Sequence, residues 1–347
     1  MQLAVVQRIL GLLLMGFSLS MLPPMAVSHW YGDGQIRYFF IPLLTMIGLG
    51  LLIWYPVRRC ALELRTHHGF IIVTLFWSVL GVVSALPFYL APHPHLSFTD
   101  AVFEAVSGFT TTGATVISGL DALPKSMLYY RAQLHFLGGM GIVVLAVAIM
   151  PMLGVGGMTL YRAETPGPMK DEKLTPRITH TARALWLVYV GLNVACALAY
   201  WGAGMSPFDA VTHAFGTIAT GGFSNYDASF AQFQSPLLEV IATVFMFLGG
   251  VNFAVHFLAF GDRSFKPYCH DIETRAFLWI CLGLSVLVAL LLLWEGVYGD
   301  PLSALRYAAF QVVSIITTTG FTSAGFAEWP SFLPILLIYI SFIGGCA

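Results

Sequence analysis

Apolar runs of about 20 residues recur along the chain and restrict it to structures that a bilayer can hold. The hydrocarbon core of a membrane is about 30 Å thick, so a helix rising 1.5 Å per residue needs about 20 apolar residues to cross it. Hydrophobic residues make up 58% of the 347 and charged residues only 10%, which excludes an ordinary soluble protein. The runs of sufficient length are 3–27, 36–57, 70–90, 129–151, 184–204, 237–260 and 276–295, and an eighth begins near Phe332. The sequence therefore predicts an all-α polytopic membrane protein.

The first apolar run has an alternative interpretation as a cleaved signal peptide. Ala26 and Ser28 are small residues at a plausible cleavage spacing. The stretch 9–27 is nevertheless long enough to span, and a second run follows closely. A retained helix is therefore favoured.

Basic residues are divided unequally between the two sides of the predicted membrane domain. Threading the runs alternately puts 12 of them on the side of the N-terminus and 4 on the other side, so the positive-inside rule makes the N-terminus cytoplasmic. The 12 are Arg8, Arg58, Arg59, Arg65, Arg162, Lys170, Lys173, Arg177, Arg183, Arg263, Lys266 and Arg275, and the 4 are Arg37, Lys125, Arg131 and Arg306. The acids on the outer side either attract cations or are simply solvated loop charges; they are Asp33, Asp100, Glu104, Asp121, Asp209, Asp227, Glu295, Asp300 and Glu328.

Three short apolar segments, 97–115, 207–224 and 303–322, do not fit this alternation. Each is too short to cross and return as helix, and too apolar to lie in water. Irregular backbone survives at membrane depth only where protein buries it or where it lines a wet cavity. We therefore expect each segment to be a half-helix that dips into the membrane and returns as extended chain.

The three segments share a sequence pattern. They end in TTGAT at 111–115, TGGFS at 220–224 and TTGFT at 318–322, so their glycines are 109 and then 98 residues apart. The apolar run that follows each segment carries a second repeated motif: FLGGMG at 136–141, FLGGVN at 247–252 and FIGGCA at 342–347. Two motifs in one order, three times over, predict three units of helix, re-entrant loop and helix, a kind of repeat common in membrane transport proteins.

The chemistry of the pore loops suits a cation. Glycine adopts backbone conformations closed to other residues, and rings of carbonyl groups can replace the hydration shell of a potassium ion. The half-helices would point their negative ends at the same place. No charged side chain lies within 110–115, 219–224 or 317–322, so selection would rest on backbone oxygens. Such segments also occur at tight turns and close helix contacts, but their threefold recurrence favours a filter.

At the motifs SGFTTTGAT (107–115), TIATGGFS (217–224) and ITTTGFT (316–322) the sequence resembles the Trk/Ktr/HKT superfamily of potassium transporters. It is most similar to the bacterial TrkH branch, which has two extra helices before the first repeat. Residues 3–57 would supply these two helices here. The resemblance implies potassium uptake through one pore ringed by four repeats, with no cofactor beyond the transported ion. It implicates Thr111, Thr112, Thr220, Gly221, Thr318 and Thr319 in potassium binding, with Gly113, Gly222 and Gly320 as the filter glycines. Serine at the first glycine tends to favour sodium in such families, so Gly113 argues for potassium.

The resemblance also implies a domain organisation. Residues 1–69 would form the two extra helices, 70–151, 184–260 and 276–347 three pore repeats, and 152–183 and 261–275 cytoplasmic loops. From 332 to 347 the chain offers only about 24 Å of helix, so the last helix is expected to be incomplete, the fourth repeat missing and the sequence truncated. A homodimer in the bacterial inner membrane is implied, working with a cytosolic nucleotide-binding regulator of the TrkA type. The two loops are candidate docking surfaces, although their charges are those of any cytoplasmic loop.

Several polar residues in apolar surroundings need partners. Glu104 and His213 fall on pore half-helices, where they are placed to hold the loop; Asn252 is expected to bond a neighbour, and Arg306 an outer acid. His135, His213 and His256 fit no ligand set, so we expect them to pack or form hydrogen bonds within the bundle. The cysteines have no metal-site or disulfide spacing and are interpreted as free thiols; they are Cys60, Cys196, Cys269, Cys281 and Cys346.

Two other functional classes were weighed. An ion-coupled secondary transporter of another cation or small solute would usually place ionisable residues at its helix breaks, where this chain has threonine and glycine. An intramembrane enzyme built on Ser107 lacks any motif that would position a base. The chain is therefore not expected to be an enzyme, and potassium transport is the favoured function.

Overall fold

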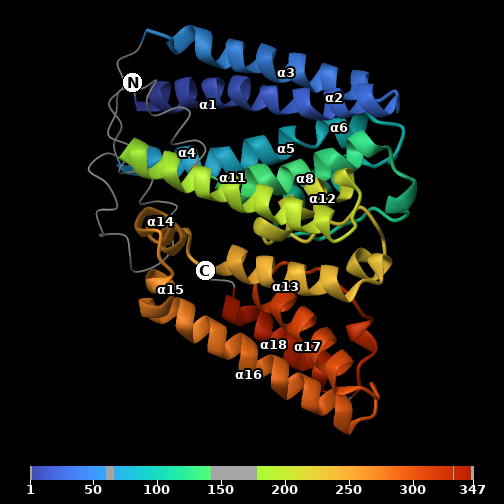
Figure 1. Ribbon diagram of the computed structural model, residues 1–347. Helices are drawn as coiled ribbons and strands as arrows, with labels where there is room; N and C mark the ends of the chain where they lie inside the picture. Colours follow the sequence, from blue (N-terminus) through green and yellow to red (C-terminus); the bar gives the residue numbers. More distant parts are fainter. Residues whose placement is uncertain (1, 60–65, 142–177, 331, 345–347) are drawn as a thin grey trace. The chain divides into compact units, whose positions relative to one another are not determined.

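A computed structural model describes residues 2–59, 66–141, 178–330 and 332–344 of the chain (Figure 1). These residues form helices and connecting segments, with no strand among them. The chain divides into two compact units. The first holds Met1–Thr110 and Ala114–Trp186, and the second holds Thr111–Gly113 and Leu187–Ala347.

The first unit contains three helical stretches long and apolar enough to cross a membrane: Ala4–Tyr31, Ile36–Val57 and His68–Leu90. Its α-helices are α1 (Gln2–Ser18), α2 (Leu22–Tyr31), α3 (Ile36–Trp54), α4 (Thr66–Leu75), α5 (Gly81–Val83), α6 (Leu86–Leu90), α7 (Phe98–Phe109) and α8 (Lys125–Gly139). Helix α1 packs along α3, α2 along α8, and α7 against both α5 and α8. A Cβ on Gly11 would lie 2.7 Å from the carbonyl oxygen of Gly50, so glycine is what lets α1 and α3 approach this closely.

Asp33 joins the turn between α2 and α3 to the start of α8. One carboxylate oxygen accepts hydrogen bonds from the Ser28 hydroxyl and from the Gln35 backbone N–H at 3.2 Å, and the other accepts from the Ser126 N–H at 2.9 Å. Burial raises the pKa of Asp33, but the hydrogen bonds from Ser28, Ser126 and Gln35 together lower it by more. The pKa of Asp33 therefore lies below its ordinary value. Asp33 is therefore a charged carboxylate when it links the α2–α3 turn to the start of α8.

Asp33→Asn is expected to lower the thermal stability of the purified protein near neutral pH. Because the folded-state pKa is depressed, the contribution of Asp33 is fully present above the unfolded value of about 3.9 and is lost as the pH falls through the folded value. The difference in melting temperature between wild type and Asp33→Asn should therefore shrink below about pH 4. Asp121→Asn changes an exposed aspartate of the same unit and serves as the control. A difference that stays constant from pH 7 to pH 3 would contradict the assignment.

The second unit contains most of α11 and all of the later helices. They are α11 (Ile178–Gly202), α12 (Pro207–Ile218), α13 (Pro236–Gly250), α14 (Phe253–Asp262), α15 (Lys266–His270), α16 (Ile272–Trp294), α17 (Pro301–Ile316) and α18 (Leu333–Gly344). Two stretches could cross a membrane as single helices, Arg183–Gly202 and Ile272–Trp294. Helix α17 lies against α13, α16 and α18, and α12 packs on α13. Helix α17 is thus at the centre of the packing in this unit.

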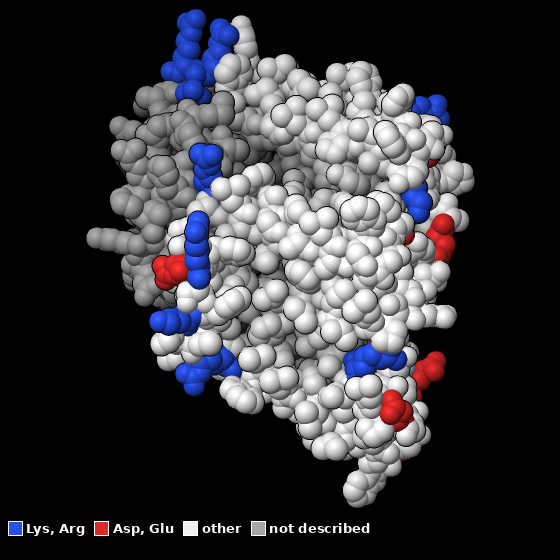
Figure 2. All heavy atoms as spheres, in the orientation of Figure 1, with Lys and Arg blue, Asp and Glu red and all other residues white. Residues whose placement is uncertain are grey.

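Helix α16 carries charged residues only near its two ends. Arg275 lies close to its start, Glu295 and Asp300 follow its end, and no charged residue occurs between Arg275 and Glu295. Over the middle of α16, Figure 2 shows neither basic nor acidic side chains. Trp279 and Leu290 are 69% and 59% exposed there. This uncharged, apolar surface is the one that lipid would cover.

The run 237–260, predicted as one straight span, is instead a bent pair of helices. Helices α13 and α14 meet at an angle of 98°. Val251 is extended at the break, and the Asn252 side chain accepts a hydrogen bond from the Ala254 N–H at 2.9 Å, which caps α14. Asn252 thus bonds a neighbour in its own chain segment, where it starts α14.

Some predictions fall on residues outside the described part of the chain. They include 142–151 of the fourth apolar run, 152–177 of the first predicted cytoplasmic loop, the end of FIGGCA, Cys60 and Cys346. The other predicted loop, 261–275, contains the end of α14, all of α15 and the start of α16. Cys196, Cys269 and Cys281 are free thiols, as expected.

Candidate functional site

Three helices of 12 to 16 residues, α7, α12 and α17, each lead directly into a segment of irregular backbone. We call these segments pore loop 1 (110–115), pore loop 2 (219–224) and pore loop 3 (317–322). Ser97 caps α7 by accepting from the Asp100 N–H at 3.2 Å, and Ser206 caps α12 by accepting from the Asp209 N–H at 3.1 Å. Each serine lies 16 residues before its loop glycine, whereas the cap of α17, Asp300, lies 20 residues before Gly320. The third helix is therefore about one turn longer.

All three pore loops have the same unusual backbone. A threonine with positive φ is followed two residues later by a glycine with positive φ. The threonines are Thr111, Thr220 and Thr318, at 54°, 49° and 58°, and the glycines are Gly113, Gly222 and Gly320, at 76°, 79° and 85°. A β-branched residue in this region is an outlier that costs about 1–3 kcal/mol. The same strain at three corresponding threonines indicates that the loops are shaped for a function.

The pore loops lie side by side, with glycine at each point of contact. A Cβ added to Gly113 would come 1.8 Å from the carbonyl oxygen of Gly221, and one added to Gly222 would come 1.9 Å from that of Thr319. At Gly320, no atom of the described part of the chain lies within 4 Å of such a Cβ. The structure therefore brings the predicted site residues of the three loops together, in the order 1, 2, 3.

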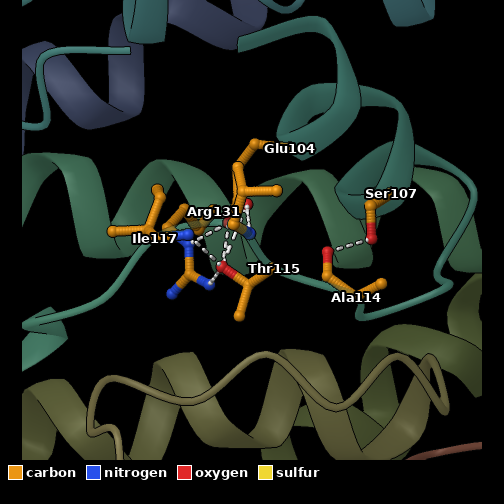
Figure 3. A network of polar contacts seen from close by, with 7 residues as sticks. Glu104, Ser107, Ala114, Thr115, Ile117 and Arg131 are labelled. Atoms are coloured by element: carbon orange, nitrogen blue, oxygen red, sulfur yellow. Dashed lines mark hydrogen bonds and ion pairs between the residues drawn. The ribbon is translucent and has the colours of Figure 1, made fainter. Parts of the chain in front are cut away.

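Behind pore loop 1, Glu104 makes a buried network with Arg131 and Thr115 (Figure 3). The Arg131 Nε lies 2.8 Å from a Glu104 carboxylate oxygen, and the two side chains are 1% and 0% exposed. The carboxylate also accepts from the Thr115 hydroxyl at 2.9 Å and from the Val116 N–H at 3.1 Å. The prediction that Glu104 holds the loop is confirmed. For its partner Arg131, the sequence predicted only a place on the outer side of the membrane.

His213 occupies the position in α12 that Glu104 occupies in α7, nine residues before the loop glycine. Its Nε2 forms a 3.0 Å hydrogen bond with the Ser224 hydroxyl, and its Nδ1 lies 2.9 Å from the Asp209 carbonyl oxygen. The prediction that His213 holds pore loop 2 is confirmed. The third residue at this position is Gln311, whose amide reaches the Phe321 carbonyl at 3.4 Å. Three different side chains therefore serve one position.

A second position, six residues before the loop glycine, also braces the chain. The Ser107 hydroxyl donates to the Ala114 carbonyl at 2.6 Å (Figure 3), and the Ser314 hydroxyl donates to the Phe321 carbonyl at 2.7 Å. The corresponding residue of α12 is Gly216, whose own carbonyl accepts from the Gly221 N–H at 2.9 Å. Sequence reasoning missed these bonds, although the spacing from the glycine could have indicated them.

Two further expectations concern Arg306 and His256. Arg306 does pair with an acid, Glu239, with 3.4 Å between nitrogen and oxygen. Glu239 lies in the first turn of α13 and was overlooked because it falls within the apolar run 237–260. His256 forms hydrogen bonds with the Tyr268 hydroxyl and the Leu248 carbonyl, which confirms the bundle interpretation.

The FLGG motif at 247–250 lies against the end of α12 and against pore loop 3. A Cβ on Gly249 would come 2.9 Å from the Ile218 carbonyl oxygen, at the end of α12. One on Gly250 would come 3.1 Å from the Thr317 side chain, in pore loop 3. In this copy of the repeat, the second motif therefore supplies a close surface behind the loops.

Comparison with known proteins agrees with this geometry. Residues 35–347 match the family TrkH, described as a cation transport protein. The chain belongs to the TrkH family. It is 52% identical to the Trk system potassium uptake protein TrkH of Vibrio parahaemolyticus over 349 residues, which cover 100% of the chain and 72% of that protein. It is 51% identical to the protein of the same name from Escherichia coli K12, covering 99% of the chain and 71% of that protein.

A solved TrkH structure confirms the fold. The crystal structure of the potassium transporter TrkH from V. parahaemolyticus superposes with a TM-score of 0.88 at 50% sequence identity, covering 100% of this chain and 71% of that one. The predicted resemblance and the all-α membrane fold are thereby confirmed. As a member of a family of cation transport proteins, the chain is a multi-pass membrane protein and not an enzyme.

Proposed function

We propose that the chain takes up potassium through a filter of backbone carbonyl groups supplied by the three pore loops. The relatives named above are potassium uptake proteins. The observation that carries the proposal is the backbone shared by the three loops, with positive φ at a threonine and again at a glycine; in pore loops 1 and 2 that glycine packs on the next loop. The potassium-binding residues proposed are Thr111, Thr112, Thr220, Gly221, Thr318 and Thr319, with Gly113, Gly222 and Gly320 as the filter glycines.

The physical basis is the replacement of water by carbonyl oxygens. A potassium ion crosses a filter when the oxygens lining it substitute for its hydration shell without holding it too tightly. Helices α7, α12 and α17 end at the loops, so the negative ends of their dipoles favour a cation there. The transported ion is the only ligand that the proposal needs.

The proposal includes a ring of four repeats, as the family resemblance implies. Within the described residues, Gly113 and Gly222 each face a carbonyl group of the next loop, and no atom lies within 4 Å of a Cβ added to Gly320. In this proposal 1–69 are the two extra helices, 70–151, 184–260 and 276–347 are pore repeats, and 152–183 and 261–275 are cytoplasmic loops.

The setting proposed is the bacterial inner membrane, with the N-terminus in the cytoplasm. Arg263, Lys266 and Arg275 lie in the predicted cytoplasmic loop 261–275, in agreement with the positive-inside rule. The relatives are named as parts of a Trk system. The proposal therefore includes a homodimer and a cytosolic nucleotide-binding regulator of the TrkA type, with 152–183 and 261–275 as its docking loops.

Rubidium uptake by Gly113→Ser tests the filter. The Cβ of the new serine would require the Gly221 carbonyl to move, so we expect rubidium uptake in a potassium-starved host to fall and the preference for potassium over sodium to weaken. Gly119→Ser is the matched control, because Gly119 has a φ of 74°, against 76° at Gly113, and nothing within 4 Å of an added Cβ. Unchanged rate and selectivity in Gly113→Ser would contradict the proposal.

A further inference from the structure

The loop that follows pore loop 2 lies against pore loop 3. We call residues 227–234 the strut loop. The Ala231 N–H donates to the Thr322 carbonyl at 3.2 Å, and the Thr322 N–H donates to the Ser229 hydroxyl oxygen at 3.2 Å. Thr322 lies two residues after Gly320. The strut loop therefore holds the backbone of pore loop 3 from both its donor and its acceptor side.

Phe230 anchors the strut loop behind the filter. Its side chain is 1% exposed. Its ring centre lies 4.7 Å from that of Phe321 in pore loop 3, 5.5 Å from Phe310 in α17 and 5.6 Å from His213 in α12. One residue thus contacts two pore helices and the loop that one of them carries.

Pore loop 3 has the weakest brace from its own helix at the position that Glu104 and His213 occupy. Gln311 reaches the Phe321 carbonyl only at 3.4 Å, at the long end of hydrogen-bond distances. Glu104 and His213 make contacts of 2.9 and 3.0 Å with their loops. The two hydrogen bonds from the strut loop therefore supply support at Thr322 that the first two pore loops obtain from their own helices.

The strut loop has strained backbone at two residues, one of which, Ser229, contacts Thr322. Ser229 has a φ of 52° and Gln234 a φ of 47°, both in the left-handed region that costs free energy for residues other than glycine. Such strain persists where the surrounding structure fixes the conformation. Here the fixed conformation aims the Ser229 hydroxyl at Thr322.

We propose that the strut loop positions pore loop 3, with Ser229 and Phe230 as positioning residues for ion selectivity. The inference rests on the proposed function. Discrimination between potassium and sodium depends on the arrangement of the filter carbonyls, and movement of Thr322 would be passed back to Gly320 and Thr319. Because the Thr319 carbonyl packs on Gly222, a displacement of Thr319 would also displace pore loop 2.

The test is Ser229→Gly in the full-length protein, with sodium inhibition of rubidium uptake as the readout. Glycine removes the backbone strain at this positive φ as well as the hydroxyl. The strain removed offsets the lost hydrogen bond, so the folded protein should be no less stable. Loss of the hydrogen bond to Thr322 is expected to weaken selectivity against sodium about threefold to tenfold. Ser229→Thr keeps the hydroxyl and should retain wild-type selectivity, even though a β-branched residue at a φ of 52° lowers stability.

Gln234→Gly is the matched control, because it relieves a similar φ in the same loop at an exposed residue. Equal selectivity in wild type and Ser229→Gly would overturn the strut inference and leave the proposed function standing. An equal shift in Ser229→Gly and Gln234→Gly would also overturn it, because relief of strain would then be the cause. If the wild-type protein itself takes up no rubidium, the proposed function fails and the inference fails with it.

Discussion

Gly222→Ala is expected to reduce potassium uptake by about tenfold to a hundredfold. The new Cβ would come 1.9 Å from the Thr319 carbonyl oxygen, and the backbone φ of 79° disfavours any side chain. Overpacking of this kind costs about 1–3 kcal/mol, and each 1.4 kcal/mol corresponds to about tenfold. Here the contact falls on a carbonyl that the filter uses. Rubidium uptake in potassium-starved cells, normalised to the protein in the membrane, measures the effect.

A control separates steric contact from backbone strain. Gly119→Ala introduces the same methyl group at a φ of 74°, where nothing lies within 4 Å. It should lower stability slightly and leave uptake per molecule near wild type. If the two variants lose uptake equally, the loss reflects strain alone, and the packing of pore loop 2 on pore loop 3 is not what matters.

The pore loops could be predicted from sequence because their chemistry is local. Each loop needs a glycine at a positive φ, and the threonine pattern around that glycine recurs at 113, 222 and 320. Counting back nine residues from the glycine leads to Glu104 and His213, whose predicted role in holding the loops is confirmed. Local backbone requirements leave a signature in one sequence.

Contacts set by packing left no such signature. The bend of 98° between α13 and α14 is invisible to hydropathy, because an apolar run reports compatibility with lipid and not direction. The partner of Arg131 was missed for a related reason: alternate threading assigns a charge to a side of the membrane but does not name its partner. Glu239, the partner of Arg306, was missed because it lies within an apolar run. The strut loop was missed because its contacts with Thr322 join residues 91 and 93 positions apart.

Removing either charge of the Glu104–Arg131 pair is expected to lower the free energy of unfolding by about 3–5 kcal/mol, because the remaining charge would be buried without a counterion. Both side chains are almost fully buried and 2.8 Å apart. Glu104→Gln also weakens the acceptor for the Thr115 hydroxyl and the Val116 N–H, so rubidium uptake should fall together with stability. Urea titration of the purified protein in detergent measures the first effect.

The double variant Glu104→Gln/Arg131→Gln decides whether a lone charge is the cause. With neither charge present, the two amides can still form hydrogen bonds, so stability should recover a large part of the loss seen in each single variant. Arg275→Gln is the control, since it removes a basic residue that is exposed to solvent; its loss should be smaller. Additive losses in the double variant would show that each residue acts through separate contacts. Recovery of stability without recovery of uptake would assign the carboxylate itself, through Thr115 and Val116, to the shape of pore loop 1.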